Sequence, residues 1–453
     1  MARSRTRRCW RRSRRPRAFA PSPPCWGCAG RPAGPQGWVA PGGCGPARRA
    51  GLHSRTVNPP QAAALPRPPI WLLVAIIGIG PFTMQVLVPS LPAMGRDLGA
   101  STSTVQLTVT LYLLGVGAGQ LIYGPLSDRF GRRPLLMGGL ALYAVASLAA
   151  ALAPGIGELL VARVAQAVGA CAGVVLVRAV IRDVWARDEA ASVLGYVTMG
   201  MTIAPMVAPI LGSLLEQSFG WRASMVACLG FGLPLALVAW LRLEETLPAP
   251  QPLPGLGAIL RAYRSLWAIP AFRAYAALTA CATGIFFAFL GGAPYVVVQG
   301  MGYSPVQFAL AFAAISVFFA AGNWLAGRLS RRMGVLRMLG MGTVITTLGA
   351  VGAAIAMVVF PPHILVFFVP MAAVAVGNGM TQPNAIAGAL SARPQLAGTA
   401  SALVGALQMG FGALMTFIVG LVEFGSGIGT SLTMAATGVA CLMALRGARR
   451  AGG

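Results

Sequence analysis

Long hydrophobic runs alternate along this chain with short polar segments. Each run is about 20 residues long, which is enough for a helix to cross a bilayer core of about 30 Å. Six runs precede a polar, proline-containing segment at 242–271, and six follow it. The pattern predicts membrane helices near 70–89, 105–124, 135–153, 159–181, 190–215, 223–241, 272–298, 305–327, 337–360, 363–390, 398–422 and 426–445.

The composition supports this pattern. Hydrophobic residues make up 56% of the 453 residues and charged residues only 10%, with a mean hydropathy of +0.72. Soluble domains contain about 45–50% apolar and about 25% charged residues. We therefore expect an all-α membrane protein of twelve transmembrane helices. Its predicted parts are a tail (1–69), a first six-helix half (70–241), a cytoplasmic linker (242–271), a second half (272–446) and a short tail (447–453).

Positive charge is concentrated in the first 69 residues, which hold 14 arginines and no acid. The other 21 arginines face ten acids, so the formal charge of +25 does not indicate a nucleic-acid-binding surface. The segment has no apolar core of the kind that a secretory signal peptide needs. Three interpretations stay open: a disordered cytoplasmic tail that touches anionic lipid, an arginine-rich transit peptide, or upstream sequence before a true start near Val57. We expect residues 1–69 to be disordered.

The arginines between the runs predict the orientation, because cytoplasmic loops keep positive charge. With both termini in the cytoplasm, only Arg96 and Arg222 lie outside, while Arg163 and Arg178 fall within the fourth run. The cytoplasmic side then holds the 17 others, which are Arg129, Arg132, Arg133, Arg182, Arg187, Arg242, Arg261, Arg264, Arg273, Arg328, Arg331, Arg332, Arg337, Arg393, Arg446, Arg449 and Arg450.

Residues for catalysis or metal binding are scarce. The chain has two histidines, His53 and His363, and the Cys25-x-x-Cys28 pair has no second pair at zinc spacing. We therefore expect neither an enzyme nor a metal site, and no cofactor.

Two loops repeat one sequence at corresponding places in the two halves. GPLSDRFGRR begins at Gly124 after the second run, and GRLSRRMGVL begins at Gly327 after the eighth. Two halves that share a loop signature are typical of transporters with a parallel repeat. The first loop fits the pattern G-x-L-x-D-R-x-G-R-R/K, and here the chain resembles the major facilitator superfamily. The resemblance implies that superfamily's fold of two six-helix halves.

The loop residues suit a gate. Gly124 and Gly131 permit a tight turn, and Asp128 can accept hydrogen bonds from a helix N-terminus or an arginine. Such contacts can hold the two halves closed on the cytoplasmic side and break when the halves rock apart. The alternative is that the arginines only enforce topology. The loop residues concerned are Gly124, Asp128, Arg129, Gly131, Arg132 and Arg133.

The fourth and fifth runs carry further polar and small residues. An arginine inside a membrane helix, such as Arg163, costs roughly 2.5–3.5 kcal/mol on insertion scales and is usually paired or functional. Gln166 follows on the same face, and Asp183 is expected to join Asp128 and Arg129 in one network. In the fifth run, the spacing of the superfamily's antiporter motif falls on Gly195, Ala204, Ala208, Pro209 and Gly212. The alternative for these small residues is a merely tight helix contact.

Together with VPSLPAMGRDLGAS, FGWRAS and GGAPYVVVQGMGYSPVQFALAF, these motifs resemble the Bcr/CflA group of multidrug efflux proteins. The resemblance implies a monomeric inner-membrane exporter of small hydrophobic drugs, driven by a proton gradient. Many members of the group carry an acid in the first helix where this chain has Gln85. The proton carrier is therefore open, and a facilitator, a dedicated metabolite exporter and a non-transporting sensor or tether stay as alternatives. Gln85, Arg163 and Gln166 are the candidates for the substrate or proton pathway.

Other polar residues at midplane depth are weaker pocket candidates, because most such residues serve as packing contacts between helices. They are Gln106, Gln120, Thr202, Asn323, Asn378, Gln382, Asn384 and Gln408, with Tyr112, Met199, Met201, Phe286 and Phe287 as soft or aromatic surface.

Overall fold

The computed structural model describes residues 67–452, apart from 202, 248, 254 and 424. Residues 1–66 of the tail that was expected to be disordered, and Thr202, lie outside the described residues. Near the end of that tail, Arg67 is described and donates to both carboxylate oxygens of Glu189. Throughout the described part the chain is helical, as predicted, with no strand. Twelve helical segments there are long and apolar enough to cross a membrane.

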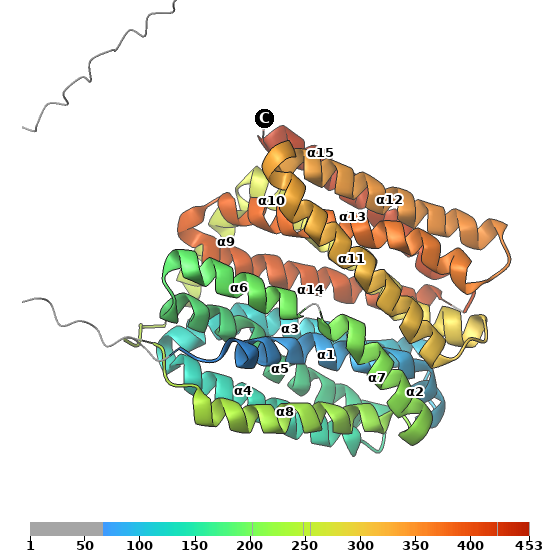
Figure 1. The fold of residues 1–453 in the computed structure, drawn as a ribbon, viewed down its shortest axis with the longest axis horizontal. Coiled ribbons are helices and arrows are strands. Elements are labelled where there is room, and N and C mark those ends of the chain that lie inside the picture. The colour runs from blue at the N-terminus through green and yellow to red at the C-terminus, as the bar shows by residue number, and fades with distance from the viewer. Residues whose placement is uncertain (1–66, 202, 248, 254, 424, 453) are drawn as a thin grey trace, which may run out of the picture. The chain divides into compact units, whose positions relative to one another are not determined.

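The first half contains eight α-helices and one short 3₁₀ turn, drawn from blue to green in Figure 1. Pro81 and Pro209 lie inside the first and fifth spans. The elements are α1 (Ile70–Leu87), η1 (Val88–Ser90), α2 (Leu91–Asp97), α3 (Thr102–Phe130), α4 (Arg132–Ala151), α5 (Ile156–Val184), α6 (Arg187–Met201), α7 (Ile203–Phe219) and α8 (Arg222–Arg242).

A linker helix, α9 (Leu256–Trp267), precedes the second half. The elements of that half are α10 (Pro270–Pro294), η2 (Tyr295–Gly300, a π-helix), α11 (Pro305–Met333), α12 (Val335–Val359), α13 (Ile364–Ser391), η3 (Pro394–Leu396), α14 (Ala397–Val422) and α15 (Ile428–Gly452).

Two parts differ from the sequence analysis. The linker at 242–271 was expected only as a polar segment, but it contains α9, whose Leu266 is fully buried beside Phe272 and Ala400. The short tail expected at 447–453 is helical through Gly452 as part of α15. Arg449 and Arg450 lie in the last turn of this helix, where positive charge interacts favourably with the helix dipole.

The repeat is visible in the two matching loops. Gly131 has φ +96° and Gly334 has φ +84°, and each is the single residue between two long helices. The amide of Gly131 donates to the carbonyl of Ser127 (3.2 Å), and that of Gly334 donates to the carbonyl of Ser330 (3.0 Å). Positive φ favours glycine because it has no Cβ. The two loops therefore match in backbone conformation as well as in sequence.

Successive spans run in opposite directions, so the arginine-bearing loops gather at one end of the spans. We call this the arginine-rich end, marked by Arg129, Arg182, Arg242, Arg332 and Arg446. Apart from the α3–α14 pair, the main contacts between the halves lie at the opposite end, where η1 packs on α10 and α11, α2 on η2, and α7 on α11. At the arginine-rich end, α6 packs mainly on α1, α5 and α7 of its own half.

One pair of helices, α3 and α14, packs extensively between the halves (Figure 1). A Cβ placed on Gly117 would lie 3.3 Å from the Cβ of Met409, so the helices approach closely there. The side-chain amide of Gln106 donates to the carbonyl oxygen of Gly291 on α10. The halves are thus joined along α3 and α14 and closed at the opposite end.

The antiporter-motif glycines offer a matched test of packing. A methyl group on Gly212 would overlap the backbone carbonyl of Val86 on α1, whereas one on Gly195 would meet nothing within 4 Å. We expect Gly212→Ala to lower the unfolding free energy by about 1–3 kcal/mol through overpacking. Gly195→Ala is expected to leave it unchanged or raise it by up to about 1 kcal/mol, since alanine favours helix. Unfolding of the detergent-solubilised variants measures both, and equal shifts would contradict this packing.

Candidate functional site

Arg132 lies at the centre of a polar cluster at the arginine-rich end of the first half. Its Nη1 donates to Asp128 Oδ1 (2.6 Å) and to Ser127 Oγ (2.5 Å), and its Nε donates to Asp183 Oδ2 (2.9 Å). The Arg132 side chain is only 4% exposed, whereas Asp128 is 48% exposed. Hydrogen bonds between ionised partners are the strong ones. One arginine therefore ties α3, α4 and α5 together.

The geometry of this cluster follows from the loop sequence. α3 ends at Phe130 and α4 begins at Arg132, so Gly131 alone turns the chain. Asp128, in the last turn of α3, is four residues before Arg132, and the positive φ of Gly131 lets their side chains meet.

Glu245 was missed by the sequence analysis and caps the first turn of α4. Its Oε1 accepts the backbone N–H groups of Arg132, Thr246 and Leu247 (2.9 Å each), and its Oε2 accepts that of Arg133 (3.2 Å). The first N–H groups of a helix lack partners within it, and a carboxylate there is favourable. The available signal was the adjacent pair Glu244 and Glu245 in a chain with ten acids.

Arg133 supports the same junction from the other side of the turn. Its Nη2 donates to the carbonyl oxygen of Trp240 on α8 (2.9 Å). Glu245 and Arg133 together fasten the end of α8 to the start of α4.

Two expectations about the loop were wrong. Arg129 does not join the aspartates: it is exposed, and Arg132 takes its place. Adjacent helical residues point in different directions, whereas residues four apart share a face. Gly124 does not permit a turn either, because α3 continues through it to Phe130.

Among the described residues, the Arg132 side chain bonds only to the first half, while its backbone N–H bonds to Glu245 of the linker. The expected contact of this cluster with the second half is not made in the present conformation. Asp128 keeps half of its surface exposed.

Arg163 and Gln166 lie in a second polar cluster, buried within the first half. Arg163 is 0% exposed, and its Nη1 donates to Gln166 Oε1 (2.6 Å). Its Nε donates weakly to the carbonyl of Thr108 (3.4 Å), and its guanidinium carbon lies 4.3 Å from the ring centre of Tyr112. Gln166 Nε2 then donates to Ser147 Oγ (2.8 Å). The expected pairing of Arg163 with Gln166 on one helix face is present.

The positive charge of Arg163 has no carboxylate partner among the described residues, and its Nη2 has no hydrogen-bond partner there. The ring of Tyr112 partly offsets this charge, since aromatic faces attract guanidinium groups. The cluster thus holds a fixed positive charge inside the first half.

Gln85 is 3% exposed, and its Oε1 has no hydrogen-bond partner among the described residues. It lies in the last turn of α1, directly before Val86, the residue that α7 approaches at Gly212. Gln85 is therefore a buried polar residue beside the contact between α1 and α7.

The acids that form hydrogen bonds or ion pairs in the described part of the chain lie toward the ends of the spans. At the opposite end, Asp97 Oδ2 accepts Trp221 Nε1 (2.9 Å) and a guanidinium N–H of Arg222 (2.5 Å). This clamp joins the VPSLPAMGRDLGAS and FGWRAS segments. Glu423 caps α15, accepting the N–H groups of Gly427 (2.9 Å) and Thr430 (2.8 Å).

The antiporter-motif residues divide between two environments. Ala208, Pro209 and Gly212 are buried on α7, which packs on α1, whereas Gly195 on α6 is exposed. The expected close packing therefore holds for the second part of the motif and not for Gly195. Another glycine, Gly200, takes the close position on α6, because a methyl there would overlap Val74 of α1.

In the second half, two glutamine side chains converge on one hydroxyl. Gln408 Nε2 and Gln382 Nε2 donate to Thr283 Oγ1 at 3.1 and 3.4 Å. Both glutamines are half-buried, and so is Phe286 on the same helix as Thr283. Thr283 was not singled out from the sequence, where one threonine in an apolar run gives no distinct signal.

Other pocket candidates serve the packing of helices. Asn378 Nδ2 donates to the carbonyl of Ala282 (2.9 Å), Asn384 Nδ2 to that of Met380 (2.9 Å) and Asn323 Nδ2 to that of Phe319 (3.0 Å). The described residues contain no group of three or more histidines, cysteines and acids that could hold a metal ion.

Twelve spans in two halves that share one loop turn define the chain as a membrane transporter of the two-half, alternating-access class. The family model of the Major Facilitator Superfamily matches residues 71–417. The chain belongs to this superfamily, and it is a multi-pass transporter rather than an enzyme.

Relatives of known name cover most of the chain. It is 35% identical over 382 residues to the chloramphenicol resistance protein of Pseudomonas aeruginosa, covering 82% of this chain and 89% of that one. It is 30% identical over 371 residues to multidrug resistance protein D of Escherichia coli, covering 80% and 91%. A bicyclomycin resistance protein homolog of Haemophilus influenzae is 29% identical, covering 80% and 92%.

Solved structures agree on the fold. A bacterial homolog of the human lysosomal transporter Spinster, in an inward-facing conformation, superposes with a TM-score of 0.68 at 18% identity, covering 84% of this chain and 96% of that one. A D-xylose–proton symporter superposes with a TM-score of 0.67 at 16% identity, covering 83% and 96%.

The Arg132 cluster predicts unequal effects for neighbouring arginines. Arg132→Ala leaves two carboxylates without their shared partner and is expected to lower the unfolding free energy by about 3–5 kcal/mol. Arg129→Ala removes the same charge from an exposed position and is expected to change it by no more than about 0.5 kcal/mol. Detergent unfolding of both variants is the measurement, and a large effect of Arg129→Ala would refute the arrangement.

Glu245 has an internal control in Glu244, which is exposed and adjacent. Loss of a helix cap costs about 0.5–2 kcal/mol, so Glu245→Ala is expected to destabilise the protein by this amount. Glu244→Ala should be close to neutral. The same unfolding assay measures both variants. Equal unfolding free energies for the two would show that the cap does not stabilise the protein.

Proposed function

We propose that this chain exports small, hydrophobic, drug-like molecules by alternating access. Its arginine-rich end faces the cytoplasm, both termini lie on that side, and it works as a monomer in the inner membrane. The names of its relatives support the substrate class. The excess of arginine at one end supports the orientation.

The observation that carries the proposal is the uneven contact between the halves. They are closed at the opposite end, while the Arg132 side chain bonds only to residues of its own half among the described residues. In this orientation the conformation is the inward-facing one, in which a substrate enters from the cytoplasm. The exposed side of Asp128 is then free to accept a partner from the second half when the arginine-rich end closes.

The substrate surface in this proposal includes the half-buried groups near Thr283. Gln382 and Gln408 offer amide groups, and Phe286, on the same helix as Thr283, offers aromatic surface. A few polar groups within apolar surface are typical of sites for drug-sized ligands.

Proton antiport is the proposed energy source. Gln85 takes the place of the first-helix acid, so the proposed carriers are Asp128 and Asp183 around Arg132. Protonation of either aspartate would change the charge at this end and so bias the equilibrium between the closed and open arrangements of the two halves. The neutral Gln85 also favours a second candidate, a facilitator of the same substrates that is not coupled to protons.

Drug uptake into inverted membrane vesicles distinguishes a proton antiporter from an uncoupled facilitator. The test compares wild type and Gln85→Asp, with and without an imposed pH gradient. Under antiport, an acidic vesicle interior is expected to raise the accumulation of radiolabelled chloramphenicol by wild type at least tenfold. Asp183→Asn should abolish this gradient effect.

Uptake by wild type that does not depend on the pH gradient, together with gradient-dependent uptake by Gln85→Asp, would establish the facilitator instead. No transport of chloramphenicol or any other apolar drug, by correctly folded protein, would overturn the export proposal itself.

A further inference from the structure

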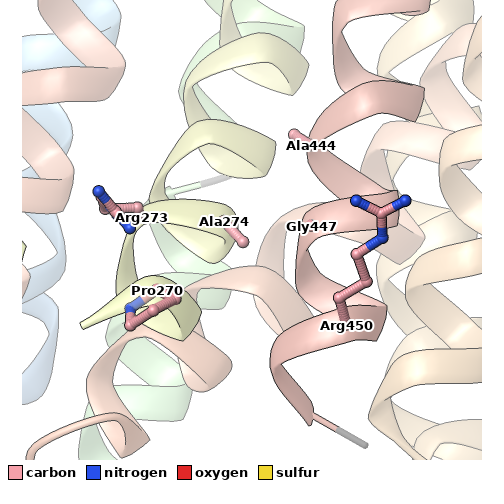
Figure 2. A pocket seen from close by; sticks show the side chains of 6 residues that line it. All are labelled: Pro270, Arg273, Ala274, Ala444, Gly447 and Arg450. Atoms are coloured by element: carbon pink, nitrogen blue, oxygen red, sulfur yellow. The ribbon is translucent and has the colours of Figure 1, made fainter.

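A crevice of about 410 Å³ opens between α10 and α15 at the arginine-rich end. Figure 2 shows Ala274 and Ala444 facing the space between the two helices, near Gly447, and Arg273 and Arg450 also line the crevice, one from each helix. A Cβ on Gly447 would lie 3.5 Å from that of Ala274, so small residues let the helices approach here. The crevice therefore has an apolar floor and a cationic rim.

The two guanidinium groups have no counter-charge of their own. Arg273 and Arg450 are exposed, and neither has a hydrogen-bond or ion-pair partner among the described residues. After Glu245 the sequence contains a single acid, Glu423. That carboxylate lies at the opposite end, where it caps α15. Among the described residues, the second half therefore supplies no acidic side chain to this rim.

The location favours a lipid over a free anion. α10 and α15 are both membrane-spanning by length and composition, and the crevice lies near their ends, at the depth of a headgroup layer. Basic pockets between membrane helices bind anionic headgroups, and guanidinium groups match phosphate oxygens well. A free phosphate would make no use of the apolar floor.

We propose that this crevice binds an anionic phospholipid. The phosphate lies between Arg273 and Arg450, and the first part of an acyl chain lies against Ala274, Ala444 and Gly447. The proposal is independent of the transported substrate, so it is tested by binding alone.

The experiment measures lipid binding to the purified full-length chain by native mass spectrometry, with phosphatidylglycerol and phosphatidylcholine as probes. Wild type is expected to prefer phosphatidylglycerol. Two arginines at about 1 kcal/mol each correspond to roughly 30-fold in affinity, so Arg273→Ala/Arg450→Ala should lose about that much. The control pair Arg337→Ala/Arg393→Ala removes the same charge from other exposed positions at this end and should lose less than threefold.

A second variant keeps the charge and fills the crevice. Gly447→Leu is expected to lower phosphatidylglycerol affinity at least tenfold, and it decides the question if the double arginine variant does not fold. The proposal would be overturned if the control pair lost as much phosphatidylglycerol affinity as Arg273→Ala/Arg450→Ala, or if Gly447→Leu bound phosphatidylglycerol as wild type does. Displacement of phosphatidylglycerol by millimolar inorganic phosphate, with no effect of Gly447→Leu, would show a free-anion site instead.

Discussion

A bilayer core offers no hydrogen-bond partner to a polar group, and the rest of this structure depends on that constraint. Every polar group within the spans must find its partner inside the protein or lose several kcal/mol. The helices satisfy the backbone, and the two arginine clusters satisfy much of the remaining polar surface. Arg132 joins three helices at one end of the first half, and Arg163 joins Gln166, Thr108 and Tyr112 inside it.

These clusters make the first half a rigid unit, which is what alternating access needs. If the halves rock as bodies, the bonds inside each half must survive while those between the halves change. The side-chain bonds of Arg132 lie within the first half, and the Glu245 cap joins the start of the linker to that half. Between the halves, α3 and α14 meet through small residues such as Gly117, and small residues permit close contact that can slide without breaking a network.

The second half is built differently. It has one acid after the linker, and that acid is used to cap α15. Its polar contacts are mostly neutral, from asparagine, glutamine and threonine to hydroxyls or backbone carbonyls. The arginines at its end are left without acids of their own half, which is why the crevice beside Arg273 and Arg450 calls for an anion from outside. In the first half, Arg132 and Arg222 are paired with acids of that half. In our proposal, Arg273 and Arg450 of the second half are paired with lipid.

The sequence by itself determined the twelve spans, the division into two halves and the repeated loop, because run length and loop charge respond directly to the bilayer. It also brought Arg163 and Gln166 together, since residues three apart share a helix face. Only the tertiary structure decided that Arg132, and not Arg129, bridges the aspartates, that Glu245 caps a helix more than a hundred residues away, and that Gly212 is packed while Gly195 is exposed. Those outcomes depend on how helices distant in sequence are rotated and positioned against one another, and a linear pattern carries no record of that arrangement.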